Sequence, residues 1–211
     1  MSSTLFYVHD PMCSWCYAFQ AGLTALKARL PPSIRIKKLV GGLAPDTTEL
    51  MSPDMRNKIQ QTWRRIEQTV PHVRFNHDFW TMNTPIRSTY PACRAVLAAA
   101  RQGSDYEDNL IRAIQNASYQ QAKNPSLSAV LLECAAEAGV DIGTFASELA
   151  SVGIETELQD QISLSRRLGA NVFPALRLQH DGIISPITVD YLDYLTMFDE
   201  IERRVGSAFR S

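Results

Sequence analysis

Two cysteines three residues apart, Cys13 and Cys16, are the side chains best suited to chemistry in this 211-residue chain. They follow an apolar run suited to a strand, residues 5–8, and a turn that contains Pro11, and an amphipathic run begins directly after them. This order places Cys13 at or near a helix N-terminus, where unpaired backbone N–H groups and the helix dipole favour a thiolate. Cys16 lies one turn further along the same face, within disulfide reach. The spacing predicts thiol–disulfide chemistry with Cys13 as the entry nucleophile.

Two other interpretations of the cysteine pair stay open, a structural zinc site and a pair of core cysteines. Zinc is disfavoured because Cys93 and Cys134 stand singly, and only His72 and His77 approach the spacing of a ligand pair. A core pair is disfavoured because a turn at the end of a strand presents residue 13 outward. We therefore expect no metal.

The composition indicates a globular protein with a substantial core. Hydrophobic residues make up 45% of the chain, which is enough for one large or two small domains without covalent staples. The 21 basic and 22 acidic residues nearly balance, so the totals predict neither a nucleic-acid partner nor a membrane-surface partner. No window approaches a membrane span, and the first apolar run is too short for a signal peptide. Taken with Met1 as the natural start, the chain is expected in the cytoplasm, where thiols stay reduced.

The periodicity predicts a sheet interrupted by helices. A strand at 4–8, a helix at 14–30 and a strand at 34–40 form a β-α-β opening that ends at Gly41-Gly42. Residues 44–153 show helical patterns and no convincing strand. The tail then returns to the opening pattern, and its predicted elements are a helix at 155–168, a strand at 172–178, a hairpin turn at 181–182 and a last helix that Thr188 caps.

The two outer pieces must share one sheet, because neither has enough strands to bury both faces of a parallel unit. The sequence therefore predicts one domain made of residues 1–43 and 154–211, and an inserted helical domain at 44–153. The insertion is tethered at two points, so we expect it to form a wall over the Cys13 turn. Its aromatic segment, residues 75–80, either reaches the surface of Trp15 and Phe173 or fills the insertion's own core.

Pro174 stands at the start of a strand that would otherwise be central, where it removes a donor from the sheet. A cis peptide between Phe173 and Pro174 would turn the chain sharply and leave the Phe173 backbone groups free to pair with an external partner. Local sequence alone favours the ordinary trans form.

The combination of these features resembles the thioredoxin fold, and specifically the DsbA-like thiol–disulfide oxidoreductases. Asp-Pro-Met-Cys-Ser-Trp-Cys-Tyr at 10–17 and Gly-Ala-Asn-Val-Phe-Pro-Ala-Leu at 169–176 are similar to a cytoplasmic branch of predicted dithiol–disulfide isomerases near the FrnE-type proteins. The resemblance spans essentially the whole chain. It implies an α/β thioredoxin-like fold with an inserted all-helical domain.

The resemblance also implies roles for individual residues. Cys13 matches the attacking cysteine and Cys16 the resolving one. The residues that it places next to the substrate are the intervening dipeptide, which tunes the reduction potential, and the cis-proline with the residue before it: Ser14, Trp15, Phe173 and Pro174.

Two departures from the family pattern affect proton transfer and the thiolate. Many relatives carry a buried carboxylate six residues before the attacking cysteine, where this chain has Tyr7. The strongly oxidising members have a His between the cysteines, which is absent here and argues against a very low pKa of Cys13. A protonated His9 would lower that pKa, although a His at the rim of a strand is more often simply solvated.

The resemblance implies a cytoplasmic thiol–disulfide oxidoreductase or isomerase that acts on protein or small-molecule disulfides. A glutathione or thioredoxin system would recycle it, and no cofactor is expected beyond glutathione as a co-substrate. One alternative is a glutathione-dependent transferase or isomerase of the kappa or 2-hydroxychromene-2-carboxylate isomerase type. Those proteins normally carry Ser where Cys13 stands. Another alternative is a non-enzymatic metal-binding module.

The sequence predicts that iodoacetamide labels Cys13 before any other thiol under native conditions. Cys13 combines a helix N-terminus with access to solvent, whereas Cys93 and Cys134 lie on apolar helical stretches. Mass spectrometry of briefly labelled protein measures the order. Earlier modification of Cys93 or Cys134 would show that the site is wrongly assigned.

Overall fold

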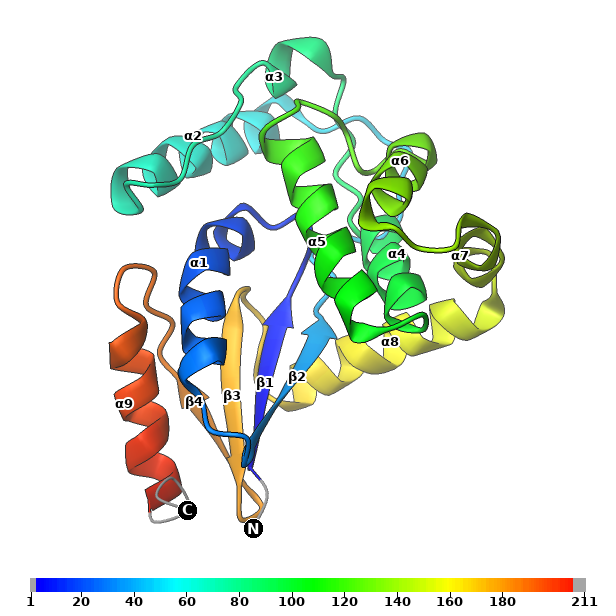
Figure 1. The fold of residues 1–211 in the computed structure, drawn as a ribbon. Coiled ribbons are helices and arrows are strands. Elements are labelled where there is room, and N and C mark those ends of the chain that lie inside the picture. Colours follow the sequence, from blue (N-terminus) through cyan, green and yellow to red (C-terminus); the bar gives the residue numbers. More distant parts are fainter. Residues whose placement is uncertain (1–2, 207–211) are drawn as a thin grey trace.

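The computed structural model describes residues 3–206 and shows an α/β fold around a four-stranded sheet with the order β2-β1-β3-β4 (Figure 1). Strand β1 (Ser3–His9) pairs in parallel with β2 (Ile34–Val40). On its other side β1 pairs antiparallel with β3 (Ala175–His180), which forms a hairpin with β4 (Ile183–Ile187). The first and last parts of the chain therefore share one sheet, as predicted.

A long helical insertion separates β2 from β3 (Figure 1). No helix within residues 3–206 is both long enough and apolar enough to cross a membrane. The helices are α1 (Ser14–Arg29), α2 (Pro53–Thr69), α3 (Phe79–Met82), α4 (Tyr90–Ala100), α5 (Ser104–Tyr119), α6 (Ser128–Ala138), α7 (Ile142–Leu149), α8 (Val152–Arg167) and α9 (Tyr194–Val205).

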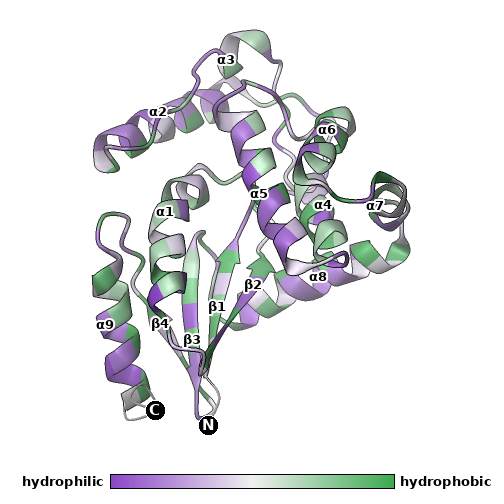
Figure 2. Cartoon of the chain, viewed as in Figure 1, coloured by the Kyte–Doolittle hydropathy of each residue, from purple (hydrophilic) through white to green (hydrophobic). Residues whose placement is uncertain are grey.

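Strand β1 is buried on both faces, because its side chains are apolar on both sides. Leu5 and Tyr7 pack with residues of α1 and α9, whereas Phe6 and Val8 pack against the end of α8 and the residues after it. The strands are accordingly rich in hydrophobic residues, and polar residues cover much of α2 (Figure 2). A strand buried on both faces reads as a continuous apolar run, which is the pattern of residues 5–8.

Helix α4 is the centre of the insertion, and Cys93, Val96 and Leu97 are among its buried residues. Helices α5, α6, α7 and α8 pack around it, and Val40 of β2 belongs to the same cluster. Helix α8 begins at Val152 with Ser151 as its cap, slightly earlier than predicted. Because α8 packs on both the insertion and β2, the domain boundary near residue 153 stays a prediction.

The tail differs from the prediction at two points. Strand β3 begins at Ala175 and not at residue 172, because the chain forms turns before Pro174. The last helix begins at Tyr194, where Asp193 caps it, and not after Thr188. The Asp190 carboxylate accepts backbone N–H bonds from the two residues before that helix, which holds them in a turn.

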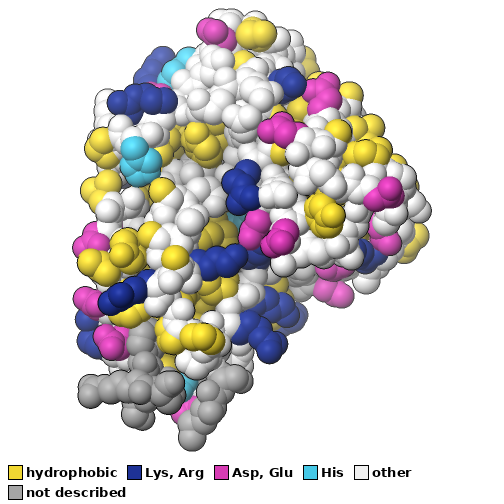
Figure 3. Space-filling model, in the orientation of Figure 1, with side chains coloured by type: hydrophobic (Ala, Val, Ile, Leu, Met, Phe, Trp, Pro, Cys, Tyr) yellow, Lys and Arg dark blue, Asp and Glu magenta, His cyan; other side chains and the backbone are white. Residues whose placement is uncertain are grey.

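An ionic cluster joins the sheet to the insertion. Lys38 of β2 forms ion pairs with Glu107 and Asp108 of α5, and Lys27 of α1 also pairs with Asp108. On the face shown in Figure 3, basic side chains lie directly beside acidic ones over α1 and α5. The insertion is thus held to the first β-α-β unit by charge as well as by apolar packing.

Replacing Gly41 by Ala is predicted to destabilise the fold by about 1–3 kcal/mol, the usual range for overpacking. A Cβ at Gly41 would lie 2.2 Å from the Phe173 ring. The control is Gly143→Ala in α7, where the new Cβ meets only the Asp141 side chain, at 3.6 Å. Because Ala favours a helix more than Gly does, the stability of this variant should stay equal or rise by up to about 1 kcal/mol. Urea unfolding of both variants measures the difference, and equal midpoints would contradict the close approach of Phe173.

Candidate active site

Cys13 is the N-cap residue of α1, as the sequence predicts. Its backbone N–H donates to the Asp10 carbonyl at 3.0 Å, and its own carbonyl accepts from Tyr17 at 3.0 Å. The sulfur therefore stands where the unpaired N–H groups of the helix begin. The turn was expected to present residue 13 outward, but Cys13 is largely buried and exposes only 7% of its surface. Side chains of the insertion stand in front of it.

Cys16 lies one turn further along α1 and is fully buried. Burial, together with the adjacent Cys13 thiol, raises the pKa of Cys16 well above its ordinary value. Cys93 and Cys134 are also buried, and burial raises the pKa of Cys134 to about 11. All four thiols are free, and Cys13 is the most exposed of them. These exposures suit Cys13 as the attacking thiol and Cys16 as a thiol that reacts only with Cys13.

The second predicted part of the site lies directly opposite Cys13. The peptide bond between Phe173 and Pro174 is cis. The Cys13 thiol donates to the Phe173 carbonyl oxygen, with 3.6 Å between sulfur and oxygen. The thiol takes one of the two acceptor positions of that carbonyl, and its pairing with an external partner stays a prediction. Pro174 itself is buried behind Phe173.

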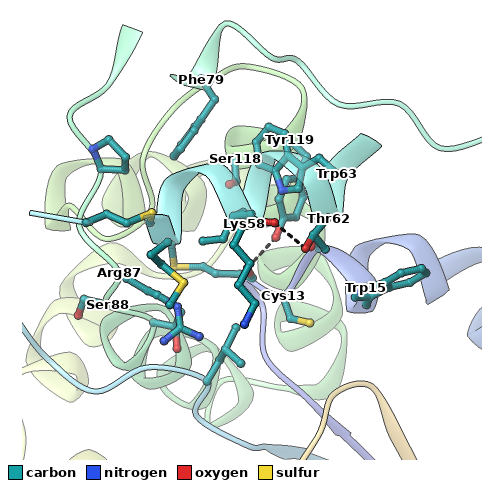
Figure 4. A pocket seen from close by; sticks show the side chains of 18 of the residues that line it. Cys13, Trp15, Lys58, Thr62, Trp63, Phe79, Arg87, Ser88, Ser118 and Tyr119 are labelled. Atoms are coloured by element: carbon teal, nitrogen blue, oxygen red, sulfur yellow. Dashed lines mark hydrogen bonds between the residues drawn. The ribbon is translucent and has the colours of Figure 1, made fainter. Parts of the chain in front are cut away.

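A pocket of about 500 Å³ opens in front of Cys13 (Figure 4). The predicted substrate-binding residues Ser14, Trp15 and Phe173 line it, and Pro174 does not. The insertion forms the opposite wall, as expected. That wall is mostly apolar and includes Met51, Met55, Ile59, Trp63, Phe79 and Trp80.

The aromatic segment of the insertion serves both of the roles considered for it. Phe79 and Trp80 line the pocket, yet each exposes at most 6% of its surface. Their rings pack on Trp63, with centroids 5.7 and 4.9 Å away. Phe75 stacks on the same indole at 4.7 Å and also contacts Tyr17 of α1 at 5.6 Å. The wall of the pocket is thus the outer surface of an aromatic core.

Asp10 is a site residue that the sequence analysis missed. Its fully buried carboxylate accepts hydrogen bonds from Met12 N–H at 2.8 Å, Leu43 N–H at 2.7 Å and Thr89 Oγ1 at 2.6 Å, and lies 3.5 Å from the Cys93 sulfur. Burial raises its pKa, and these donors oppose the rise. The bond from Met12 N–H is a common turn motif that the sequence near Asp10 can indicate. No pattern near residue 10 indicates the donors at residues 43, 89 and 93.

Tyr119 is the second missed residue. Its hydroxyl donates to the Met12 carbonyl at 2.7 Å, and its ring is buried on the pocket wall beside Trp63 (Figure 4). Asp10 and Tyr119 thus fix the residue before Cys13 through its N–H and its carbonyl, respectively.

His9 does not have the solvated position or the charge considered for it. It is fully buried, and neither ring nitrogen has a hydrogen-bond partner among the described residues. Burial, reinforced by the positive charge of Lys38, lowers its pKa to about 3, so His9 is neutral near pH 7. Its ring stacks on Tyr7 at 5.0 Å. Tyr7 is buried too, and burial followed by the charge of a Cys16 thiolate raises its pKa.

The described residues contain no group of three or more His, Cys, Asp or Glu side chains arranged for a metal ion. They do bring together a C-x-x-C pair at a helix N-terminus, a cis-proline loop opposite it and a helical insertion after the second strand. This is the arrangement of thioredoxin-fold proteins of the DsbA-like class. A family model described as thioredoxin matches residues 6–183, and the chain belongs to this family.

Solved structures confirm the predicted DsbA-like fold. A candidate protein disulfide isomerase from Nitrosomonas europaea superposes with a TM-score of 0.84 at 23% identity, covering 98% of this chain and all of that one. The cytosolic disulfide reductase DsbM from Pseudomonas aeruginosa gives 0.77 at 25% identity, over 96% of this chain and all of that one. A second DsbM structure, with GSH, gives 0.74 at 24% identity, over 95% of this chain and 99% of that one.

The curated relatives are named as adapter proteins and not as disulfide reductases. The ClpXP adapter protein SpxH from Halalkalibacterium halodurans is 24% identical over 178 residues, which is 82% of this chain and 58% of that protein. SpxH from Bacillus subtilis is 23% identical, over 86% of this chain and 62% of that one. The chain thus spans about three fifths of the length of the curated relatives it matches.

The buried neutral His9 predicts a loss of stability at acid pH. Its pKa is about 3 in the folded state and about 6.5 in the unfolded chain, so its contribution is complete above pH 6.5. It then falls by about 1.4 kcal/mol per pH unit as the pH drops toward 3. Urea unfolding of wild type and His9→Phe from pH 4 to 7.5 isolates this slope, because the contribution of Asp10 cancels. Replacement of the exposed His72 by Gln is the control, and equal slopes for wild type and His9→Phe would disprove the assignment.

Proposed function

We propose that this protein is a thiol–disulfide oxidoreductase in which Cys13 attacks and Cys16 resolves. One observation carries the proposal: Cys13 caps α1 at the base of a pocket, whereas Cys16 is sealed one turn behind it. A substrate that enters the pocket meets one thiol, that of Cys13, because Cys16 does not line the pocket. The thioredoxin family and the fold of DsbM support the same class of activity.

The proposed reaction conserves atoms and electrons in two exchanges. The Cys13 thiolate attacks one sulfur of a substrate disulfide, so a mixed disulfide forms and the other substrate sulfur leaves as a thiolate that takes up a proton. Cys16 then loses its proton and attacks the Cys13 sulfur. The substrate is released as a dithiol or two thiols, and the Cys13–Cys16 pair holds the two-electron oxidation.

Isomerase activity uses the same mixed disulfide. A second thiol of the substrate attacks the mixed disulfide before Cys16 does, and Cys13 is then released without net oxidation. The raised pKa of Cys16 favours this branch because a protonated thiol attacks slowly.

Recycling in a reducing compartment requires a thiol donor. We propose glutathione or a thioredoxin-type dithiol, and the GSH in one DsbM structure supports the first. Two molecules of a monothiol reduce the Cys13–Cys16 disulfide and form one disulfide of the monothiol. The cytosolic DsbM also supports the cytoplasm as the compartment.

An adapter role is a second candidate, favoured by the names of the two curated relatives. An adapter binds a protein partner without needing the cysteine pair. A variant in which both Cys13 and Cys16 are Ser separates the two functions. Retained capture of a partner protein would support the adapter role, and loss of all disulfide exchange would support the oxidoreductase.

Replacing Cys16 by Ser is predicted to trap a mixed disulfide between Cys13 and its substrates. Attack can still proceed while resolution cannot. Intact-mass spectrometry of the variant after incubation with cell extract detects an adduct of a protein or of a small molecule, and peptide mapping places it on Cys13.

Cys13→Ser is the control and should trap nothing. Retained activity of Cys16→Ser without any adduct would reject the dithiol mechanism. Conjugation of glutathione to an electrophile by Cys16→Ser would instead support the glutathione transferase alternative.

A further inference from the structure

The charged side chains that line the pocket in front of Cys13 are all positive. Its lining includes two charged side chains, Lys58 of α2 and Arg87 of the loop before α4, and no Asp or Glu (Figure 4). Within residues 3–206, neither the Lys58 ammonium nor the Arg87 guanidinium makes an ion pair or a side-chain hydrogen bond. Other arginines nearby do have partners, since Arg94 pairs with Asp46 and Glu155. Two unpaired cations beside an apolar cavity fit an anionic occupant.

The inner wall of the pocket carries polar groups that lack protein partners. Ser118 and Asn124 line it and each exposes 4% of its surface. Neither the Ser118 hydroxyl nor the Asn124 amide nitrogen has a partner in the described chain, whereas the Asn124 carbonyl oxygen accepts from Ser126 N–H at 3.1 Å. Their polar atoms open into the pocket, where water or a ligand can supply the missing hydrogen bonds.

The size and position of the pocket restrict what can reach the sulfur. Cys13 is 93% buried, and the walls in front of it come from α2, the loop before α4 and residues 171–173. A cavity of about 500 Å³ lies within the range of small-molecule sites. The insertion thus stands in front of the sulfur, which favours a small disulfide over one held on the surface of a folded protein.

From these observations we infer that the preferred substrate is an acidic disulfide of low molecular weight. Lys58 and Arg87 bind its carboxylates, and Ser118 and Asn124 hydrogen-bond its polar groups while its sulfur meets Cys13. This inference rests on the proposed function and assigns specificity to the insertion, separately from the cysteine pair. Arg87 is half-buried and Lys58 is exposed, so Arg87 makes the larger contribution.

The test compares disulfides of different charge. Turnover is measured with dithiothreitol as the reductant, after subtraction of the uncatalysed rate. The three substrates are oxidised glutathione, which is anionic, bis(2-hydroxyethyl) disulfide, which is neutral, and cystamine, which is cationic. For oxidised glutathione we expect kcat/KM to fall about 10-fold in Arg87→Ala and about 3-fold in Lys58→Ala, mainly through KM. The neutral disulfide should change less than 2-fold, and cystamine should react faster. Arg65→Ala removes an exposed cation of α2 outside the pocket and should change none of the three.

Equal losses for all three disulfides, or none, would overturn the inference. So would reduction of insulin, a protein disulfide, with a kcat/KM equal to that for oxidised glutathione.

A binding measurement separates this inference from the proposed function. Isothermal titration of Cys13→Ser with S-methylglutathione, which cannot exchange disulfides, reports the pocket alone. Affinity should fall about 10-fold when Arg87→Ala is added and about 3-fold when Ser118→Ala is added. Such binding without any turnover by wild type would reject the oxidoreductase and keep the subsite. Turnover without charge-dependent binding would reject the subsite and keep the oxidoreductase.

Discussion

The buried carboxylate of Asp10 is the constraint on which the site depends. A carboxylate removed from water is destabilising unless hydrogen bonds replace its hydration. Asp10 obtains its donors from the Cys13 turn through Met12, from the chain entering the insertion through Leu43, and from the start of α4 through Thr89. Separating any of these segments from the others would leave buried charge unpaired. The relative position of the thioredoxin-like part and the insertion is therefore fixed beside the reactive sulfur.

This connection explains how an insertion shapes chemistry that the first helix already provides. Tyr119 holds the Met12 carbonyl, so the turn before Cys13 is fixed by residues far along the chain. The same helical block then supplies the aromatic and basic wall of the pocket. A C-x-x-C pair at a helix N-terminus offers a nucleophile, and in the proposed function the wall selects the disulfides that reach it.

Local patterns in the sequence predicted the sheet, α1 and the positions of Cys13 and Cys16, because strand, turn and helix signals act over a few residues. They did not predict how deeply Cys13 and His9 are buried. That burial comes from side chains of the insertion and from packing across the sheet, which have no signal near residue 13. Asp10 was missed for the same reason, since its donors Leu43, Thr89 and Cys93 lie more than 30 residues away.

His9 and Asp10 are neighbours in the chain, and both are fully buried, yet they differ in their hydrogen bonding. His9 has no hydrogen-bond partner for either ring nitrogen, and burial keeps it neutral near pH 7. Asp10 has several donors, which oppose the effect of burial on its pKa. His9 therefore cannot supply the positive charge considered for a thiolate at Cys13. Burial raises the pKa of Cys16, and the Asp10 charge adds to the rise. In the proposed mechanism Cys16 thus keeps its proton until the mixed disulfide on Cys13 is in place.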